Sequence, residues 1–353
     1  MSGTSCCACA CGRVTDRGWS EGFVETGAGR VAGVKTLWSW RDRLGAWAVC
    51  WGIGRMRYTV PPGLYAAGSP TPDSPVLATA NYKLSFDHVR RALAGLDAWV
   101  LVLDTKGVNV WCAAGKGTFG TEELVSRIES SGVAHVVGHR TLVLPQLGAP
   151  GVAAHEVSRQ TGFKVVYGPV YARDLPAFLR AGMRATPEMR RVGFTLRERL
   201  AVTPIELVHR FIPALILMAL FVASSGLGRH GYRLDLGQWV WIALAVGSIA
   251  FAGIVLTPAL LPYLPGRSFA LKGAVTGAAL GVALAWLWPF GWLAGVSAGL
   301  LSVSACSLLG LMFTGCTPYT SASGVRSEMS WALPAQGALA IVGLAGWLAA
   351  RFM

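Results

Sequence analysis

The uneven distribution of charge along this 353-residue chain constrains its fold more than any other feature of the sequence. Residues 205–353 carry only seven basic and three acidic side chains, whereas residues 1–204 carry 24 basic and 15 acidic ones. A helix needs about 20 predominantly apolar residues to cross a bilayer. The weakly charged part contains five stretches near that length, at roughly 207–227, 239–260, 269–288, 292–313 and 331–352. We therefore expect a soluble domain over 36–204, followed over 205–353 by an all-α membrane domain of five transmembrane helices.

The basic residues near the five stretches indicate their orientation, because cytoplasmic loops of membrane proteins carry an excess of Lys and Arg. An odd number of spans places the two termini on opposite sides of the membrane. With the first domain inside, the inner basic residues are Arg190, Arg191, Arg197, Arg199, Arg210, Arg267, Lys272 and Arg326, against Arg229, Arg233 and Arg351 outside. The sequence thus predicts a multi-pass protein of the cytoplasmic membrane, with a cytoplasmic N-terminal domain and an outward C-terminus.

The net charge of +13 favours anionic membrane lipids over nucleic acid as a partner. The sequence has no run of Lys and Arg with interleaved aromatic residues, such as nucleic-acid-binding segments show. The spans contain almost no ionisable residue, whereas ion-coupled transporters usually keep carboxylates there. We expect an anchor or docking platform whose helices pack through Gly-x-x-x-Gly spacings at 273/277/281 and 291/295/299. A soft-metal path through Cys306 and Cys316 is the alternative.

Residues 1–35 are predicted to form a disordered tail rich in Gly and Cys. Its cysteines, Cys6, Cys7, Cys9 and Cys11, lack the Cys-x2-Cys spacing of zinc and iron–sulfur sites. No secretory segment precedes the soluble domain, so we expect that domain to stay in a reducing cytosol without disulfides.

From residue 76 onward, strand-like and helix-like segments alternate. Apolar runs typical of buried strands occur at 76–82, 99–103, 141–144 and 164–167, and helical spacing occurs at 85–96, 122–130, 152–161 and 174–181. Repeated strand–helix units favour a parallel sheet with helices on both faces, in a Rossmann- or flavodoxin-like α/β domain. Such sheets bind ligands beyond the carboxyl ends of their strands. The segment after the 99–103 run is therefore a candidate binding loop.

That segment contains the residues with the clearest chemistry. Asn109 is a good helix N-cap, which places Cys112 in the first turn of a short helix. There the N–H groups and the positive end of the helix dipole favour a thiolate, and Lys116 adds positive charge on the same face. Three glycines end the helix and leave room for a large planar ligand: Gly115, Gly117 and Gly120. A phosphate-binding loop is excluded, because the Gly-Lys pair is followed by Gly and not by Ser or Thr. On these grounds Cys112 is a nucleophile, a redox thiol, a metal ligand or a small buried residue of a tight helix start.

Residues 109–123, NVWCAAGKGTFGTEE, resemble the cap-helix signature of the membrane corrinoid protein of mercury methylation, the HgcA family. The soluble domain of that family is related to the corrinoid iron–sulfur protein of the acetyl-CoA pathway. Five further stretches resemble the same family: RDRLGAW at 41–47, YTVPPGLY at 58–65, PTPDSP at 70–75, TANYKLSFD at 79–87 and LPQLGAPG at 144–151. With the five spans, the resemblance covers the chain from about residue 37 to its end.

The resemblance implies a cobalamin-type corrinoid bound base-off, with the Cys112 thiolate as catalytic residue and lower axial ligand of the cobalt. The cofactor-binding residues that the signature implies are Asn109, Val110, Trp111, Cys112, Ala113, Ala114, Gly115, Lys116, Gly117 and Thr118. The histidine-ligand signature Asp-x-His-x-x-Gly of cobalamin proteins is absent, which agrees with a thiolate in place of imidazole. Thr79 and Asn81, at the end of the first strand-like run, either face the corrinoid or cap the strand end.

For function, the resemblance implies a corrinoid-dependent methyltransferase that passes the methyl group of methyl-cobalt to thiol-bound Hg(II) as a carbanion equivalent, forming methylmercury. The implied partners are a methyl-folate methyltransferase or other methyl donor, and a ferredoxin with two 4Fe–4S clusters as reductant. Three other functions stay open. They are a membrane corrinoid methyl carrier of one-carbon metabolism with mercury incidental, a membrane-tethered metal-binding or redox-sensing module, and a transporter, which the polar-poor spans disfavour.

Overall fold

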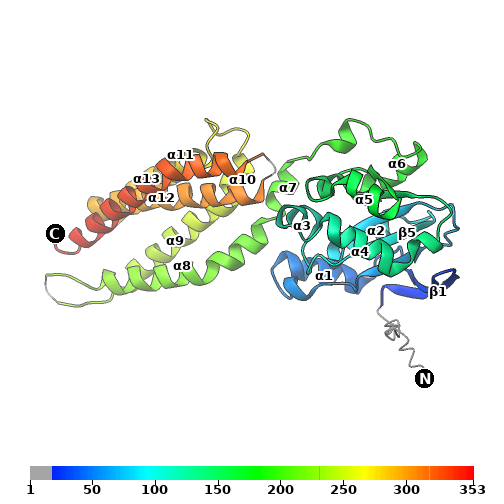
Figure 1. Ribbon diagram of the computed structural model, residues 1–353. Helices are drawn as coiled ribbons and strands as arrows, with labels where there is room; N and C mark the ends of the chain where they lie inside the picture. The colour runs from blue at the N-terminus through cyan, green and yellow to red at the C-terminus, as the bar shows by residue number, and fades with distance from the viewer. Residues whose placement is uncertain (1–17, 230, 318) are drawn as a thin grey trace, which may run out of the picture. The chain divides into compact units, whose positions relative to one another are not determined.

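The computed structural model describes residues 18–229, 231–317 and 319–353, and the chain forms two compact units (Figure 1). The first unit comprises the residues up to 49 together with 53–192, and the second comprises 50–52 and 193–353. The first unit is an α/β domain, whereas the second is helical.

The first unit is built on one mixed sheet of seven strands in the order β1-β2-β3-β5-β4-β6-β7. The strands are β1 (Ser20–Thr26), β2 (Gly29–Val34), β3 (Gly63–Ala67), β4 (Val76–Ala80), β5 (Ala98–Leu103), β6 (Thr141–Leu144) and β7 (Lys164–Tyr167). The four strands that the alternation predicted, β5-β4-β6-β7, pair in parallel. The prediction of a wholly parallel sheet was wrong, because β1 pairs antiparallel with β2 and β3 pairs antiparallel with β5.

Residues 18–35 are folded, so the prediction of a disordered tail over 1–35 was wrong for this part. The strands β1 and β2 form a hairpin, and Trp19 and Val31 are buried in the unit. The glycines that suggested disorder serve the hairpin. Gly29 has a left-handed φ of 103° beside the turn, and a Cβ at Gly33 would lie 2.0 Å from the carbonyl oxygen of Glu21. The cysteines of residues 1–17 lie outside the described residues: Cys6, Cys7, Cys9 and Cys11.

Helices cover both faces of the sheet, as predicted. They are α1 (Trp40–Cys50), α2 (Lys83–Ala92), α3 (Val110–Lys116), α4 (Thr121–Ser131), α5 (Ala154–Thr161) and α6 (Leu175–Arg180). Side chains of β5 alternate between two cores. Trp99 and Leu101 pack with α3, α4 and α5, whereas Val100 and Val102 pack with α2 and α6. Because both faces of β5 are buried, this strand is apolar throughout.

The second unit contains five helices whose length and composition allow them to cross a membrane, the number that the sequence predicted. The candidate spans are Leu196–Ser225, Leu236–Leu260, Phe269–Leu287, Trp292–Cys316 and Ala322–Ala349. They are built from α7 (Leu196–Leu200), α8 (Thr203–Ser225), α9 (Leu236–Phe251), the π-helical turn η6 (Ala252–Leu256), α10 (Thr257–Leu260), α11 (Phe269–Leu287), α12 (Trp292–Met312), η7 (Phe313–Cys316) and α13 (Ala322–Ala349).

Glycines allow α11 and α12 to pack closely, as their Gly-x-x-x-Gly spacing predicted. A Cβ at Gly273 would lie 2.2 Å from the carbonyl oxygen of Cys306, and a Cβ at Gly281 would lie 2.8 Å from that of Gly299. In lipid the hydrophobic effect does not drive helices together, so close packing of small residues must do so.

The two cysteines of this unit occupy separate surroundings. The thiol of Cys306 is buried and lies 3.6 Å from the carbonyl oxygen of Ile249, whereas the thiol of Cys316 lies 3.9 Å from the carboxylate of Glu206. Within the described part of the chain, no group of three His, Cys, Asp or Glu side chains could hold a metal ion. The alternative of a soft-metal path through the two cysteines thus gains no support.

We expect Gly281→Val to destabilise the second unit by about 1–3 kcal/mol, the usual effect of overpacking, because the new side chain would meet the backbone of α12. Gly247→Val is the matched control, since a Cβ at Gly247 in α9 has no atom within 4 Å. Thermal unfolding of the detergent-solubilised chain, followed by circular dichroism, measures the difference. Equal unfolding temperatures of the two variants would contradict the packing.

Candidate functional site

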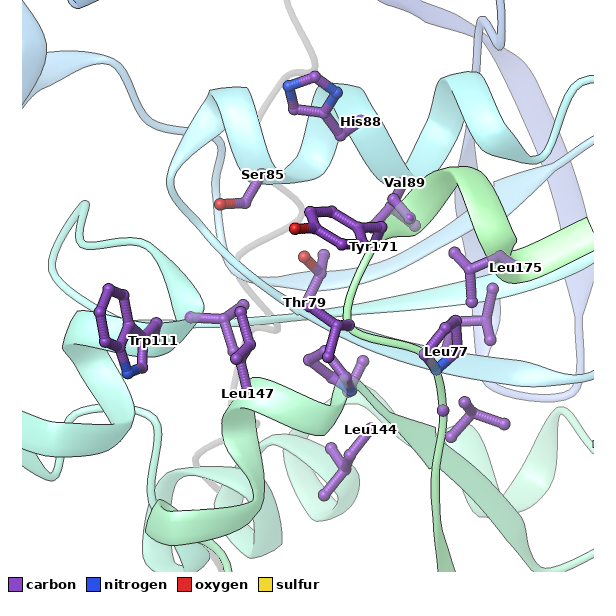
Figure 2. A pocket seen from close by; sticks show the side chains of 18 of the residues that line it. Leu77, Thr79, Ser85, His88, Val89, Trp111, Leu144, Leu147, Tyr171 and Leu175 are labelled. Carbon is purple, nitrogen blue, oxygen red and sulfur yellow. The ribbon is translucent and has the colours of Figure 1, made fainter. Parts of the chain in front are cut away.

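A cavity of about 480 Å³ lies at the carboxyl ends of the parallel strands (Figure 2). It is lined by Thr79 of β4, Leu144 of β6 and Gly168, which directly follows β7. The chain goes from β4 to β5 on one side of β4 and later adds β6 on its other side, so the winding of the sheet reverses between β4 and β6. Open α/β sheets bind ligands at such a reversal. The cavity therefore occupies the place where this topology is expected to hold a ligand.

The walls of the cavity are mostly apolar. Figure 2 shows Tyr171 and Thr79 near its centre, with Trp111 and Leu147 to one side and Leu175 to the other. A mostly apolar cavity with a few polar groups suits an organic ligand with a large apolar or aromatic part. The lining residues with a hydroxyl, amide, imidazole or charged group are Thr79, Ser85, His88, Asn109, Tyr171 and Arg173.

The helix α3 begins beside the cavity and places Cys112 at the protein surface. Asn109 caps the helix, as predicted, because its Oδ1 accepts a hydrogen bond from the N–H of Cys112 at 2.9 Å. Asn109, Val110 and Trp111 line the cavity, and Trp111 is 44% exposed. Cys112 comes next in the chain, is exposed, and lies outside the lining. A ligand that extends from the cavity over the start of α3 can therefore reach the thiol.

The remaining residues of the 109–118 segment separate into an inner and an outer set. Ala113 and Ala114 are buried in the core and fix the helix to the sheet. Gly117 ends the helix with a φ of 81°, and the space where its Cβ would stand is open, as it is at Gly115. The hydroxyl oxygen of Thr118 is buried and has no hydrogen-bond partner among the described residues. The exposed residues are Gly115, Lys116 and Gly117.

Asn81 holds the loop between β5 and α3. Its Oδ1 accepts hydrogen bonds from the N–H and the hydroxyl of Thr105 at 3.1 and 2.9 Å, and from the N–H of Gly107 at 3.0 Å. Its Nδ2 donates to the carboxylate of Asp104 at 3.1 Å. The side chain of Asn81 thus braces the loop after β5, and Thr79 lines the cavity. Contact of either residue with a ligand stays a prediction.

The sequence analysis did not identify the acidic residues that complete this loop. The N–H of Asp104 donates to the carboxylate of Glu123 at 2.7 Å, and Arg127 pairs with Glu123 at 2.8 Å. Burial opposes ionisation of Asp104, yet the hydrogen bond from Lys106 holds the pKa of its carboxyl below the ordinary value. The sequence feature that could have revealed Asp104 is its position directly after a buried strand.

A buried ion-pair network fixes α2, which forms one wall of the cavity. The Nζ of Lys83 lies 2.7 Å from the carboxylate of Asp42 in α1 and 2.6 Å from that of Asp87. Arg90, which is fully buried, lies 2.7 Å from Asp87 and 2.9 Å from Asp42. Two acids and two bases cancel in charge, so the network buries no uncompensated ion. It also holds in place the turns of α2 that present Ser85 to the cavity.

The charges of this network make the first unit sensitive to pH at both extremes. Burial opposes ionisation of Asp42, but hydrogen bonds from Lys83, Ser39 and Arg90 hold the pKa of its carboxyl well below the ordinary value of 3.8. Burial also opposes the charge of Lys83, but Asp87 and Asp42 raise its pKa above 10.5. The lowered Asp42 pKa contributes stability that is fully present above its unfolded pKa and is lost as the pH falls. The raised Lys83 pKa contributes stability that is present below its unfolded pKa and is lost as the pH rises through the folded one.

We expect Asp42→Asn to lower the free energy of unfolding at pH 7 by about 3–5 kcal/mol, because it leaves buried positive charges uncompensated. The variant should also lose part of the acid-induced destabilisation that the wild type shows below about pH 4. Thermal unfolding between pH 3 and 7 measures both effects. Glu25→Gln is the control, since Glu25 forms an exposed ion pair with Arg30. A pH dependence identical in wild type and Asp42→Asn would contradict the assignment.

We expect Asn109→Ala to loosen α3, because it removes the acceptor of the Cys112 N–H. Loss of an N-cap costs about 1 kcal/mol, which corresponds to roughly fivefold faster amide exchange in the first turn. Asn109→Ser is the matched control, since Ser is also a good N-cap. Hydrogen exchange of the α3 peptide measures the change, and equal exchange in the Ala and Ser variants would argue against the cap.

Residues 54–179 match the family model of the CO dehydrogenase/acetyl-CoA synthase delta subunit. Among curated relatives, the gamma subunits of the acetyl-CoA decarbonylase/synthase complex from Methanopyrus kandleri and Archaeoglobus fulgidus are 38% and 37% identical over 122 residues. The gamma subunit from Methanocaldococcus jannaschii is 34% identical over 128 residues. These alignments cover 34–36% of this chain and 26% of each relative. The chain thus spans about a quarter of the length of the curated relatives that it matches.

The segment that matches the family model contains β3 to β7, the residues that line the cavity, and the whole of α3. It ends before the helices of the second unit. This similarity supports the relation to acetyl-CoA-pathway proteins that the sequence suggested. The part of the chain that forms the cavity and carries Cys112 is therefore similar to the CO dehydrogenase/acetyl-CoA synthase delta subunit and to gamma subunits of the acetyl-CoA decarbonylase/synthase complex.

Proposed function

We propose that the chain is a membrane-anchored corrinoid protein that carries a methyl group, with Cys112 as the lower axial ligand of the corrinoid cobalt. The observation that carries this proposal is an exposed thiol at the start of α3, next to Trp111 and the cavity at the carboxyl ends of the strands. The similarity of residues 54–179 to subunits of the acetyl-CoA pathway supports it, because this group includes corrinoid iron–sulfur proteins.

The residues around Cys112 fit a corrinoid. Cys112 belongs to no cluster of three metal-binding side chains in the described part of the chain, so a metal bound there would take its other ligands from its own cofactor. The open surfaces at Gly115 and Gly117 leave space for a large ring, and the buried hydroxyl of Thr118 is available for a hydrogen bond. The apolar cavity accepts another part of the same ligand. We assign corrinoid contacts to Thr79 and to the residues of 109–118 other than the core residues Ala113 and Ala114, with Asn81 supporting the loop behind them.

A bound methylcorrinoid supplies a methyl–cobalt bond, which protein side chains alone cannot provide. The contribution of Cys112 is an anionic sulfur donor in place of the neutral imidazole found in many cobalamin proteins. A thiolate stabilises a more oxidised metal better than imidazole does, and this favours departure of the methyl group with its electron pair. Asn109 orients the first turn that presents the sulfur.

The acceptor that suits such a methyl group is an electrophile, and we propose thiol-bound Hg(II), with methylmercury as the product. This finer assignment rests on the resemblance of residues 109–123 to the cap-helix signature. A methyl-folate methyltransferase or another methyl donor would load the protein, and a ferredoxin with two 4Fe–4S clusters would reduce it. The chain would lie in the cytoplasmic membrane with its first unit in the cytoplasm and its C-terminus outside.

A second candidate function is a membrane corrinoid methyl carrier of one-carbon metabolism for which mercury is incidental. It is favoured by the names of the curated relatives, which are subunits of acetyl-CoA decarbonylase/synthase complexes. The two candidates share the corrinoid and the role of Cys112, and they differ only in the methyl acceptor. Comparing methyl transfer to Hg(II) with transfer to other acceptors separates them.

The role of Cys112 is tested in the full chain, reconstituted with methylcorrinoid under anoxic conditions and supplied with thiol-bound Hg(II). We expect Cys112→Ala to lower methylmercury formation by more than the roughly 10- to 100-fold that loss of a supporting residue around a metal costs. We expect Cys112→His to retain the corrinoid but to transfer methyl to Hg(II) poorly, since imidazole is neutral. Cys50→Ala is the control, because Cys50 lies outside the cavity and α3.

Absorption spectra of the same samples report on the cobalt directly. The wild type and Cys50→Ala should share one visible spectrum, and both Cys112 variants should differ from it. Wild-type methylmercury formation by Cys112→Ala would refute the proposed ligand role. A wild-type spectrum without corrinoid bands would refute the proposal that the chain binds a corrinoid.

A further inference from the structure

The helix α1 turns its apolar side chains away from the domain to which it belongs. Trp40, Leu44 and Trp47 follow one another at helical spacing and are 66%, 55% and 59% exposed. On the opposite side of the same helix, Asp42 and Val49 are buried. In a surface helix of a soluble domain the apolar stripe normally faces the core. In α1 the apolar stripe instead faces away from the core.

Exposed apolar side chains also precede and follow the helix in the sequence. Leu37, which precedes α1, is 78% exposed, and Ile53 and Met56, which follow it, are 62% and 72% exposed. A contiguous set of large exposed apolar side chains marks an interaction site on a soluble domain. We name this surface the α1 face, and its apolar members are Leu37, Trp40, Leu44, Trp47, Ile53 and Met56.

The α1 face is flanked by positive charge. Arg41 and Arg43 lie on the two sides of the apolar stripe of α1 and are exposed, as is Arg57. Asp42 is the only acidic residue between 37 and 57, and its carboxylate is buried against Lys83 and Arg90. The exposed charged side chains of residues 37–57 are therefore all basic.

Tryptophan, leucine and arginine together are the composition of a helix that lies in the interface of an anionic bilayer. The aromatic and aliphatic groups enter the region between headgroups and acyl chains, while the guanidinium groups remain with the lipid phosphates. Long basic side chains favour this position because their stems are apolar and their ends are charged. A protein partner would not need positive charge on both sides of the apolar stripe.

The chain also keeps the first unit near a membrane. This unit ends at residue 192, and α8, within the first candidate span, begins at Thr203. Even fully extended, the connection reaches at most about 40 Å. A bilayer surface is thus always available to the α1 face at high effective concentration, as for any tethered binding site.

We propose that the α1 face is a membrane-binding surface, which inserts shallowly into the headgroup region of a leaflet that contains anionic lipid. The proposal does not depend on the corrinoid or on the acceptor of the methyl group. Membrane binding by the α1 face can therefore fail while the methyl-carrier function holds, and the methyl-carrier function can fail while membrane binding holds. The membrane spans anchor the chain, and the α1 face in addition fixes the orientation of the first unit on the surface.

The test uses the full chain in nanodiscs, with an environment-sensitive fluorescent amino acid in place of Leu44 or, as control, of Ser158. Ser158 is exposed on α5, which packs on the other face of the sheet from α2 and its ion-pair partner α1. The discs contain phosphatidylcholine alone or with phosphatidylglycerol, and brominated acyl chains serve as quenchers in the membrane. Iodide serves as the quencher in water.

At position 44 we expect blue-shifted emission, quenching by brominated lipid and protection from iodide, all stronger in discs with phosphatidylglycerol. At position 158 we expect quenching by iodide alone. Arg41→Glu combined with Arg43→Glu should remove the dependence on phosphatidylglycerol and reduce quenching by brominated lipid.

Three results would overturn the proposal. In the first, the probe at position 44 behaves like the probe at position 158. In the second, it is protected from iodide but not quenched by brominated lipid, which would mean that protein, including a second copy of the chain, covers the face. In the third, the double arginine variant behaves like the wild type, so that charge plays no part.

Discussion

The placement of the candidate site depends on the buried side chain of Asn81. One amide oxygen accepts three hydrogen bonds from the segment that leaves β5, and the amide nitrogen donates to Asp104. This support lets the chain make a turn in which Lys106 and Gly107 both have left-handed φ values, 57° and 73°, which a lysine seldom adopts without such support. The turn delivers Asn109 to the position from which it caps α3. An asparagine at the end of one strand thus determines where the thiol of the neighbouring loop reaches the surface.

The ion pairs of Asp42 connect the wall of the cavity with the outward face of α1. Inside, the carboxylate compensates Lys83 and Arg90, and so it holds α2 where it lines the cavity. Outside, the same helical turn presents Trp40 and Leu44 to the surroundings. If Asp42 faced water instead, Lys83 and Arg90 would keep only Asp87 as a partner, and one buried positive charge would be uncompensated. The orientation of α1 is therefore fixed by electrostatics, against the usual preference of an amphipathic helix.

The strands β4 to β7 and the helices between them could be predicted, because apolar runs and helical spacing are local signals. The helix α1 was missed, although Trp40, Leu44 and Trp47 follow helical spacing. The hairpin of β1 and β2 was missed because Gly29 and Gly33 suggested disorder, although each has a specific place in the hairpin.

The candidate site was predicted in part, for a similar reason. The cap of α3 by Asn109 is local, and it was confirmed. The role of Asn81 stayed open because a polar residue at a strand end either binds a ligand or caps the strand, and only the neighbouring loop decides between them. The cavity itself was beyond prediction, since it is formed by segments from Leu77 to Leu175 that meet only in the folded sheet.

Polar side chains inside the second unit connect its helices. The hydroxyl of Ser302 donates to the carbonyl of Gly277 at 3.0 Å, and that of Ser304 donates to the carbonyl of Gln336 at 2.8 Å. In lipid, polar groups must be satisfied within the protein, and these hydroxyls are satisfied by carbonyls of the neighbouring helices. Their polarity thus holds helices together. In the first unit, Asn81 holds the loop that leads to α3, and Asn109 caps that helix.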